Sequence, residues 1–322
     1  MDPLSQILKS VQLEGAVFLN AEFSAPWCVR GEAGMAIYRH RIQPYEHMVF
    51  FHYLTEGRCK VRLSDDSHVL EVSEGDIVIF PRDDSHFMGS DLQIAPLETE
   101  GAHSAGVEVC EDVIQIRHGG AGATTRFVCG YLLCGTSMSR SLFAALPRIF
   151  RVPIRDGPSA SLLGGLFQAG VRESLDARPG AASIRAKLAE LMFVEALRHH
   201  VETMTPAGAS WLAGVRDAQI GRALALLHSQ PGRNWTVDEL ASEVAMSRSA
   251  LADRFMALVG KSPMQYLMHW RLTLAGQTLR SSREAIARVA ERFGYESEAA
   301  FNRAFKRQFG IPPAMWRKAA PA

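Results

Sequence analysis

The chain has 322 residues, 47% of them hydrophobic and 21% charged, which is the composition of a globular protein with two or three domains. No apolar run approaches the roughly 18–20 residues that a membrane span requires, and the first residues lack the basic and apolar stretches of a secretory signal. We therefore expect a cytoplasmic protein that does not associate with membranes.

The distribution of charge narrows the class of protein further. From Arg216 to the end, 16 lysines and arginines stand against 9 acidic residues, a net charge of +7, whereas the preceding residues hold 19 basic and 25 acidic side chains, a net charge of −6. A basic back half indicates a polyanionic partner. The five cysteines are odd in number and form no CxxC pair, which argues against a disulfide framework and against a zinc cluster.

Residues 1–150 are predicted to be mostly β-structure. The runs 50–54 and 76–81 are β-prone and are bounded by turn formers. The glycine-rich segment 119–122 precedes a strand-like run at 124–133 and lacks the Gly-Lys-Ser/Thr ending of a phosphate-binding loop. We interpret it as a tight turn.

From 159 to 203 the apolar residues recur at helical spacing. One helix is marked around Leu162–Phe167 and a second around Ile184–Leu197, with Pro179 and Gly180 between them. We predict a helical connector or dimerisation segment at 151–205, a linker at 206–215, and an all-helical domain at 216–322.

The helical domain contains two segments built to one plan, at about 236–258 and 284–309. In the first, Thr236 and Glu239 fit a capping box, and Ser247 is a good N-cap for a second helix. That helix turns Leu251 and Phe255 inward. Its outward side carries four other residues, Ser249, Ala252, Asp253 and Met256.

The second segment repeats this plan about 50 residues later. Ser281 and Glu284 are predicted to cap its first helix, and Gly294 supplies a turn with positive φ. Ser297 then caps a helix whose inward side holds Phe301 and Phe305. A helix presented in this way fits the DNA major groove.

These stretches resemble the DNA-binding domain of the AraC/XylS family. The matching runs are 240–241, 247–251, 260–267, 270–272 and above all 294–307, followed by 309–313. The resemblance implies two helix-turn-helix motifs joined by a long helix at about 263–280, whose recognition helices enter successive major grooves. It also implies promoter DNA and RNA polymerase as partners, a homodimer, and a role as an activator or repressor rather than an enzyme.

Carried over by position, the resemblance names candidate DNA contacts. Base contacts are expected from Ser249, Ala252 and Asp253 in the first motif and from Glu298, Ala299, Asn302 and Arg303 in the second. Phosphate contacts or helix-flank charges are expected from Arg248, Arg254, Lys306 and Arg307. Arg303 is the only long cation among the base-reading positions.

The front half is similar to the cupin-type domain that precedes such DNA-binding domains, on the residues 51–54, 56–57, 74–81 and 84–86. The stretch 125–147 also matches a subgroup that includes reactive-chlorine-sensing regulators. The fold class expected is therefore α+β and multidomain: a cupin-like β-barrel, a helical connector and an all-α DNA-binding domain. The barrel is expected to sense a small molecule or an oxidant, with His52, His86 and Cys129 as effector or redox candidates. Redox sensing requires an accessible thiol of low pKa.

Enzymatic cupins commonly hold a metal through a His-x-His pair, a carboxylate and a later histidine. This chain offers only the looser set His47, His52, Glu56 and His86 as metal-ligand candidates, so no cofactor is expected to be required. Two alternatives stay open. One is a metal-dependent cupin enzyme fused to a DNA-binding domain, and the other is a constitutive DNA-binding protein whose front half only dimerises.

Overall fold

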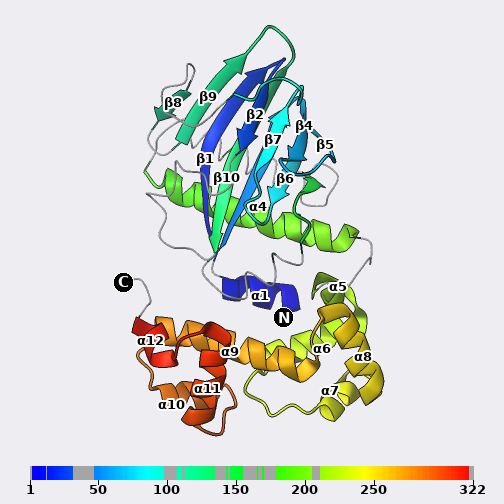
Figure 1. Ribbon diagram of the computed structural model, residues 1–322, viewed down its shortest axis with the longest axis vertical. Helices are drawn as coiled ribbons and strands as arrows, with labels where there is room; N and C mark the ends of the chain where they lie inside the picture. The colour runs from blue at the N-terminus through cyan, green and yellow to red at the C-terminus, as the bar shows by residue number, and fades with distance from the viewer. Residues whose placement is uncertain are drawn as a thin grey trace. The chain divides into compact units, whose positions relative to one another are not determined.

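The computed structural model describes residues 2–11, 13–31, 47–97, 107–110, 113–134, 146–154, 179–204 and 211–318, with the single residues 143, 165 and 169. The described residues form two compact parts, a strand domain and a helical domain (Figure 1). The expected helix near 162–167 lies outside the described residues, apart from the helical Gly165. Among the described residues, no helix is long and apolar enough to cross a membrane.

Where the structure describes it, the strand domain contains two sheets and one long helix. The larger sheet has the order β11-β6-β3-β10-β1-β9-β8, and the smaller has the order β2-β7-β4-β5. The bounds are β1 Leu13–Ser24, β2 Cys28–Gly31, β3 His47–Glu56, β4 Arg58–Leu63, β5 Leu70–Ser73, β6 Asp76–Phe80, β7 His86–Gly89, β8 Val107–Cys110, β9 Val113–Gly119, β10 Thr124–Cys134 and β11 Phe150–Pro153.

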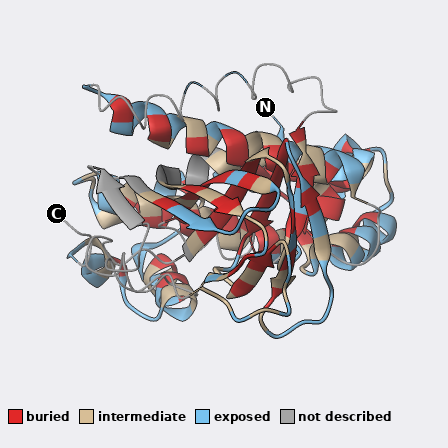
Figure 2. Cartoon of the chain, turned by 90° about the horizontal axis from the view of Figure 1, so that it is seen from above, coloured by how far each residue is buried: buried red, intermediate tan, exposed pale blue. Residues whose placement is uncertain are grey.

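Alternation along the strands explains why the two sheets face each other. In β4 the exposed or half-exposed Arg58, Lys60 and Arg62 alternate with Cys59, Val61 and Leu63, which are buried. The apolar core takes side chains from both sheets, including the stacked rings of Phe23 and Phe127. Figure 2 shows buried positions along the strands.

Gly119, the last residue of β9, lies in close contact with the end of β1. Gly119 ends β9 with φ +131°, and a Cβ there would lie 2.0 Å from the carbonyl oxygen of Ser24, so only glycine fits. The segment 119–122, expected to be a tight turn, instead crosses the end of β1, which lies between β9 and β10 in the sheet. Gly120 and Gly122 N–H donate to the carbonyl oxygens of Ser24 and Ala25 on the way.

The domain boundaries differ from those expected in three places. β11 extends the larger sheet past residue 150, pairing with β6, and helix α4 (Ala181–Thr203) packs against β1 and β10 (Figure 1). The segment 151–204 is thus part of the strand domain where it is described. At the other end of the chain, helix α1 (Pro3–Val11) packs against α6 and belongs to the helical domain. The expected linker 206–215 contains a helix from Trp211 onward, with Trp211 buried.

Besides α1, the helices that the structure bounds in the helical domain are α5 Trp211–Arg216, α6 Ala218–Ser229, α7 Val237–Glu243, α8 Arg248–Val259, α9 Pro263–Ser281, α10 Ile286–Arg292, α11 Glu298–Phe309 and α12 Pro313–Lys318. The long α9 begins with a capping box made by Ser262 and Gln265, and Pro263 occupies its first turn. One end of α9 packs Tyr266 and Trp270 into the first motif, and the other packs Leu272, Ala275 and Leu279 into the second.

The capping predictions are confirmed at three positions and wrong at one. Thr236 with Glu239 forms a capping box, and the Ser247 and Ser297 hydroxyls accept from Ala250 and Ala300 N–H. Ser281 is instead the last residue of α9.

Glu284 does not cap a helix either. Its carboxylate accepts from Arg292, and α10 begins at Ile286 after Ala285, whose side chain makes no capping bond. Because α9 continues through Ser281, the first turn of α10 is displaced along the chain.

Candidate functional site

The two recognition helices, α8 and α11, present different outward faces. On α11, Arg303, Lys306 and Arg307 are exposed and Asn302 is half-buried, opposite the buried Phe301 and Phe305. Within the described part of the chain, Arg303 and Lys306 make no ion pair. Their charges are therefore open to solvent and to an approaching polyanion.

The outward face of α8 carries no cation. Ser249 and Asp253 are exposed, Ala252 is half-buried and Met256 has 45% of its surface exposed, all opposite the buried Leu251. The base-reading candidates are thus on the surface of both helices, as expected from the helical period.

The two arginines expected to contact phosphates beside α8 already have partners. The Arg254 guanidinium lies 2.5 Å from the carboxylate of Asp217 and also donates to Gln219. Asp217 is only 11% exposed and caps α6 through its other oxygen. Arg254 therefore holds α8 against the start of α6, a role that sequence reasoning missed because the partners lie 37 residues apart. Arg248 makes a looser pair with Asp238 at 3.3 Å, with both side chains exposed.

Arg271 on α9 is a further positioning residue that the sequence did not reveal. Its guanidinium donates to the carbonyl oxygens of Pro231 and Arg233, at 2.6 and 2.8 Å, and lies beside Gly294 in the turn of the second motif. It thereby joins α9 to the loop before the first motif and to the turn of the second.

In the strand domain, the three effector or redox candidates come together. His52 on β3 lies between Cys129 on β10 and His86 on β7, with Nδ1 2.6 Å from the cysteine Sγ and Nε2 2.9 Å from the other histidine's Nε2. All three are at least 92% buried, inside a core that is otherwise largely apolar. β3 pairs directly with β10, and His52 is the partner of Cys129 in that register.

The hydrogen-bond directions in this cluster follow from its chemistry. A backbone carbonyl only accepts, so His86 Nδ1 donates its hydrogen to the Asp84 carbonyl oxygen at 3.0 Å. Burial lowers the pKa of His86 to about 4 and the pKa of His52 well below its ordinary value, so both rings are neutral. His86 Nε2 must then accept from His52 Nε2–H, and His52 Nδ1 accepts from the Cys129 thiol.

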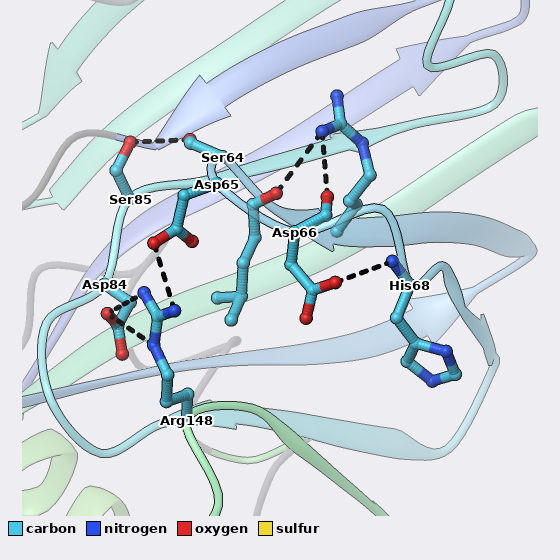
Figure 3. A network of polar contacts seen from close by, with 9 residues as sticks. Ser64, Asp65, Asp66, His68, Asp84, Ser85 and Arg148 are labelled. Atoms are coloured by element: carbon cyan, nitrogen blue, oxygen red, sulfur yellow. Dashed lines mark hydrogen bonds and ion pairs between the residues drawn. The ribbon is translucent and has the colours of Figure 1, made fainter.

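This chain of bonds reaches the protein surface through Asp84. The side chain of Asp84 accepts two hydrogen bonds from Arg148, which also pairs with Asp65 (Figure 3). Nearby, the Ser64 and Ser85 hydroxyls are 2.8 Å apart. The loop that orients His86 is therefore clamped from outside by an arginine that is 40% exposed.

The cluster does not have the properties that a reactive thiolate requires. Burial raises the pKa of the Cys129 thiol well above its ordinary value, and Cys129 is only 3% exposed. Cys129 therefore lacks the accessible, low-pKa thiol that redox sensing requires.

The residues proposed for a metal do not form one site. Two ligands on a tetrahedral zinc ion lie about 3.3–3.7 Å apart, whereas the cluster atoms touch each other directly. Glu56 is exposed and pairs with Arg126 at the end of β3, and the side chain of His47 lies outside the described part of the chain. Among the described residues, no group of three or more histidine, cysteine or acidic side chains is arranged to hold a metal ion.

Comparison with known proteins agrees with this arrangement. Residues 2–202 match a family described as cupin, and residues 240–319 match a family described as a helix-turn-helix domain. The chain is 33% identical to a putative AraC-like transcription regulator of Streptomyces lividans, over 99% of this chain and 98% of that protein.

Two further relatives match over nearly full length. The transcriptional regulator AlkR of Acinetobacter baylyi is 30% identical over 99% of both chains. The RCS-specific transcriptional activator RclR of Escherichia coli is 24% identical over 99% of this chain and 98% of that one. With its strand-rich cupin-like domain and its paired helix-turn-helix motifs, the chain belongs to the AraC family of DNA-binding transcriptional regulators and is not an enzyme.

Proposed function

We propose that this regulator reads promoter DNA with α8 and α11 in two successive major grooves, and that α11 contributes most of the direct base recognition. The observation that carries this proposal is the pair of N-capped, outward-facing helices joined by the single helix α9. A continuous helix of 19 residues keeps the two recognition helices at a constant separation.

The charges of the two faces support different roles. Arg303 has the geometry to donate two hydrogen bonds to guanine, and Asn302 to pair with adenine. Lys306, Arg307 and Arg248 are proposed as phosphate contacts, whereas Arg254 is proposed to act by holding α8 in place.

In-vitro selection from random duplex DNA, followed by genome-wide mapping of bound sites, tests this proposal. We expect a bipartite site with two short half-sites about 10–10.5 base pairs apart, one helical turn of DNA. A single half-site, or half-sites with variable spacing, would contradict the rigid two-groove arrangement.

We further propose that the strand domain is the sensor and that the Cys129–His52–His86 chain is its responsive element. A hydrogen-bonded chain buried in an apolar core has few alternative partners, so breaking one link leaves a buried polar group unpaired at a cost of about 1–3 kcal/mol. A small ligand that displaces the Cys129 thiol from His52 would break the first link.

The chain offers a matched control for this test. Cys134 is also fully buried, and burial raises the pKa of its thiol to about 12, but it lies outside the histidine chain. We expect Cys129→Ala, which removes the first link, to change the operator affinity, and Cys134→Ala to leave it as in the wild type. An unchanged operator affinity in Cys129→Ala would show that this chain of hydrogen bonds is not the responsive element.

We propose that the regulator is a homodimer formed through α4. This helix exposes Ile184 and Leu191, at 45% and 41%, on the side away from its buried residues. Within its own helix Lys187 pairs with Glu190, and Glu195 pairs with Arg198, both at 3.0 Å. In an antiparallel pair of α4 helices centred on Leu191, Lys187 of each copy would face Glu195 of the other and exchange these partners. Such a twofold pairing buries the apolar stripe and matches the charges.

Charge exchange separates this arrangement from other dimers. In analytical ultracentrifugation we expect Lys187→Glu and Glu195→Lys each to weaken dimerisation, and the double variant to restore it. A double variant weaker than either single variant would contradict the antiparallel register.

We also propose, from the family alone, that the dimer contacts RNA polymerase and acts as an activator. Promoter-dependent transcription in vitro tests this proposal.

A further inference from the structure

The outward face of α8 differs from a typical DNA-reading surface in having no cationic side chain. With 100° per residue, Ser249, Ala252, Asp253 and Met256 share one side of the helix, opposite the buried Leu251 and Phe255. Met256 is 45% exposed on this side. A single exposed apolar side chain needs no explanation in general. Met256, however, lies on the face with which a recognition helix contacts base edges.

The cations nearest to this face do not change its character. Arg254 is committed to Asp217 within the domain, and Arg248 lies beside Asp238 at the edge of the helix. The net charge of the four-residue face is therefore −1, from Asp253. At the corresponding positions of α11, 50 residues later, Arg303 replaces Asp253 and Lys306 replaces Met256.

The chemistry of this face limits which base edges it fits. In the major groove, guanine presents two acceptors and would repel a carboxylate, whereas cytosine and adenine present an amino group that a carboxylate can accept from. Thymine presents a C5 methyl group, for which methionine and alanine side chains are suitable apolar partners.

We infer that α8 recognises its half-site by apolar contact of Met256 and Ala252 with thymine methyl groups, with Asp253 accepting from an adjacent amino group and excluding guanine. This inference rests on the proposed entry of α8 into a major groove. It assigns to the first motif a readout by methyl groups and to the second a readout by cationic hydrogen bonding.

Replacement of thymine by deoxyuridine tests the inference, because it removes the methyl group and nothing else. The probe is the strongest duplex selected by the full-length protein from random DNA, with each thymine of the α8 half-site replaced in turn. We expect a loss of about fourfold in affinity at one or two thymines, the effect of one methyl group losing its apolar contact. Thymines in the α11 half-site should be less sensitive.

Two variants connect the effect to the side chains. Met256→Ala should abolish the difference between thymine and deoxyuridine at one of these positions. Met315→Ala removes another exposed methionine, 56% exposed on α12, and should keep the fourfold difference at every one of them. Asp253→Asn should raise the frequency of guanine at one position of the selected half-site.

The outcomes distinguish this inference from the function on which it depends. If the selected DNA shows base preference in both half-sites but deoxyuridine changes nothing, methyl recognition is overturned and the two-groove function stands. If base preference is confined to the α11 half-site, the role assigned to α8 is overturned as well. If no sequence is selected, the proposed reading of DNA itself fails.

Discussion

The two helix-turn-helix motifs share their helix caps and buried core positions but differ in the exposed residues of their recognition helices. Both recognition helices start at a serine cap, Ser247 and Ser297, and both end at a glycine in the left-handed conformation, Gly260 and Gly310. The buried Leu251 and Phe255 of α8 correspond to the buried Phe301 and Phe305 of α11. The outward faces instead carry opposite charge, which shows that caps and core set the shape of the motif while exposed residues are left to set what it recognises.

The interiors of the two motifs also differ. The second has a core of aromatic and aliphatic side chains, including Phe301, Phe305 and Val289. The first contains a polar chain in which Trp211 Nε1 donates to the Tyr266 hydroxyl, which bonds to His228 at 2.7 Å. His228 also stacks on Trp270 at 4.2 Å between ring centroids.

The turns give the sharpest contrast, and the largest effect is expected there. Gly294 has φ +76°, and a Cβ would lie 2.8 Å from Arg271 Nη2 and 3.1 Å from the Gly232 carbonyl oxygen. We expect Gly294→Ala to destabilise the second motif by about 2–3 kcal/mol, from the left-handed backbone and the displaced arginine. Hydrogen exchange of α10 and α11 in the full-length protein measures this loss.

The matched variant is in the first motif, where Ala245 occupies the same place with φ +54°. Ala245→Gly relieves the left-handed strain but adds backbone entropy to the unfolded chain, so we expect a gain below about 1 kcal/mol. Equal responses of the two turns would contradict the assigned role of Arg271.

Base discrimination is the next largest expected difference. Arg303→Ala should abolish the preference at one base pair, a change of about 1–3 kcal/mol or roughly 5- to 150-fold, whereas Asp253→Ala should cost less affinity. Affinities for the selected site and for single-base variants measure it. An equal loss on specific and scrambled DNA for Arg303→Ala would show that the arginine contacts only phosphate.

Acid should destabilise the core of the first motif more than the core of the second. Burial lowers the pKa of His228 to about 3, whereas the unfolded side chain titrates near 6.5. Below pH 6.5 the unfolded state binds a proton that the folded state does not, so stability is complete above this pH and falls toward pH 3. The slope is at most about 1.4 kcal/mol per pH unit.

Hydrogen exchange at pH 7.5 and 5.5, corrected for intrinsic rates, measures this difference in stability between the two motifs. α6 and α8 should lose protection before α11, and His228→Gln should reduce the difference. His269, whose pKa burial lowers to about 4, lies on the shared helix α9 and is kept in every variant. Uniform loss of protection in the wild type would argue against His228 as the cause.

The smallest effect is expected from the loss of a single lysine that contacts phosphate and no base. Lys306→Ala should weaken binding to all duplexes alike and reduce the slope of log affinity against log salt by about one. Arg254→Ala should instead loosen α8 from α6, with a fall in thermal stability that persists without DNA. A stable Arg254→Ala protein with a reduced salt slope would return this arginine to the phosphate contacts.

Local pattern and family resemblance were sufficient for the helical domain. Serine caps, a capping box and apolar spacing are short-range signals, so α7, α8, α9 and α11 were predictable within a residue or two at most ends. The start of α10 was wrong because the end of α9 is set by its packing, not by a local signal. The fold class of the front half was also predictable, and the three-residue cluster was named, but the sequence contained no evidence that its members touch.

By itself, the sequence determined the family, the two motifs and the difference in charge between their recognition helices. These depend on residues a few positions apart, which one helix or turn brings together whatever surrounds it. Only the tertiary structure decided that Arg254 pairs with Asp217, that α1 packs on α6, and that Cys129 bonds to His52 across 77 residues. Strand register and helix packing create those contacts, and they depend on the whole core rather than on any local stretch of the chain.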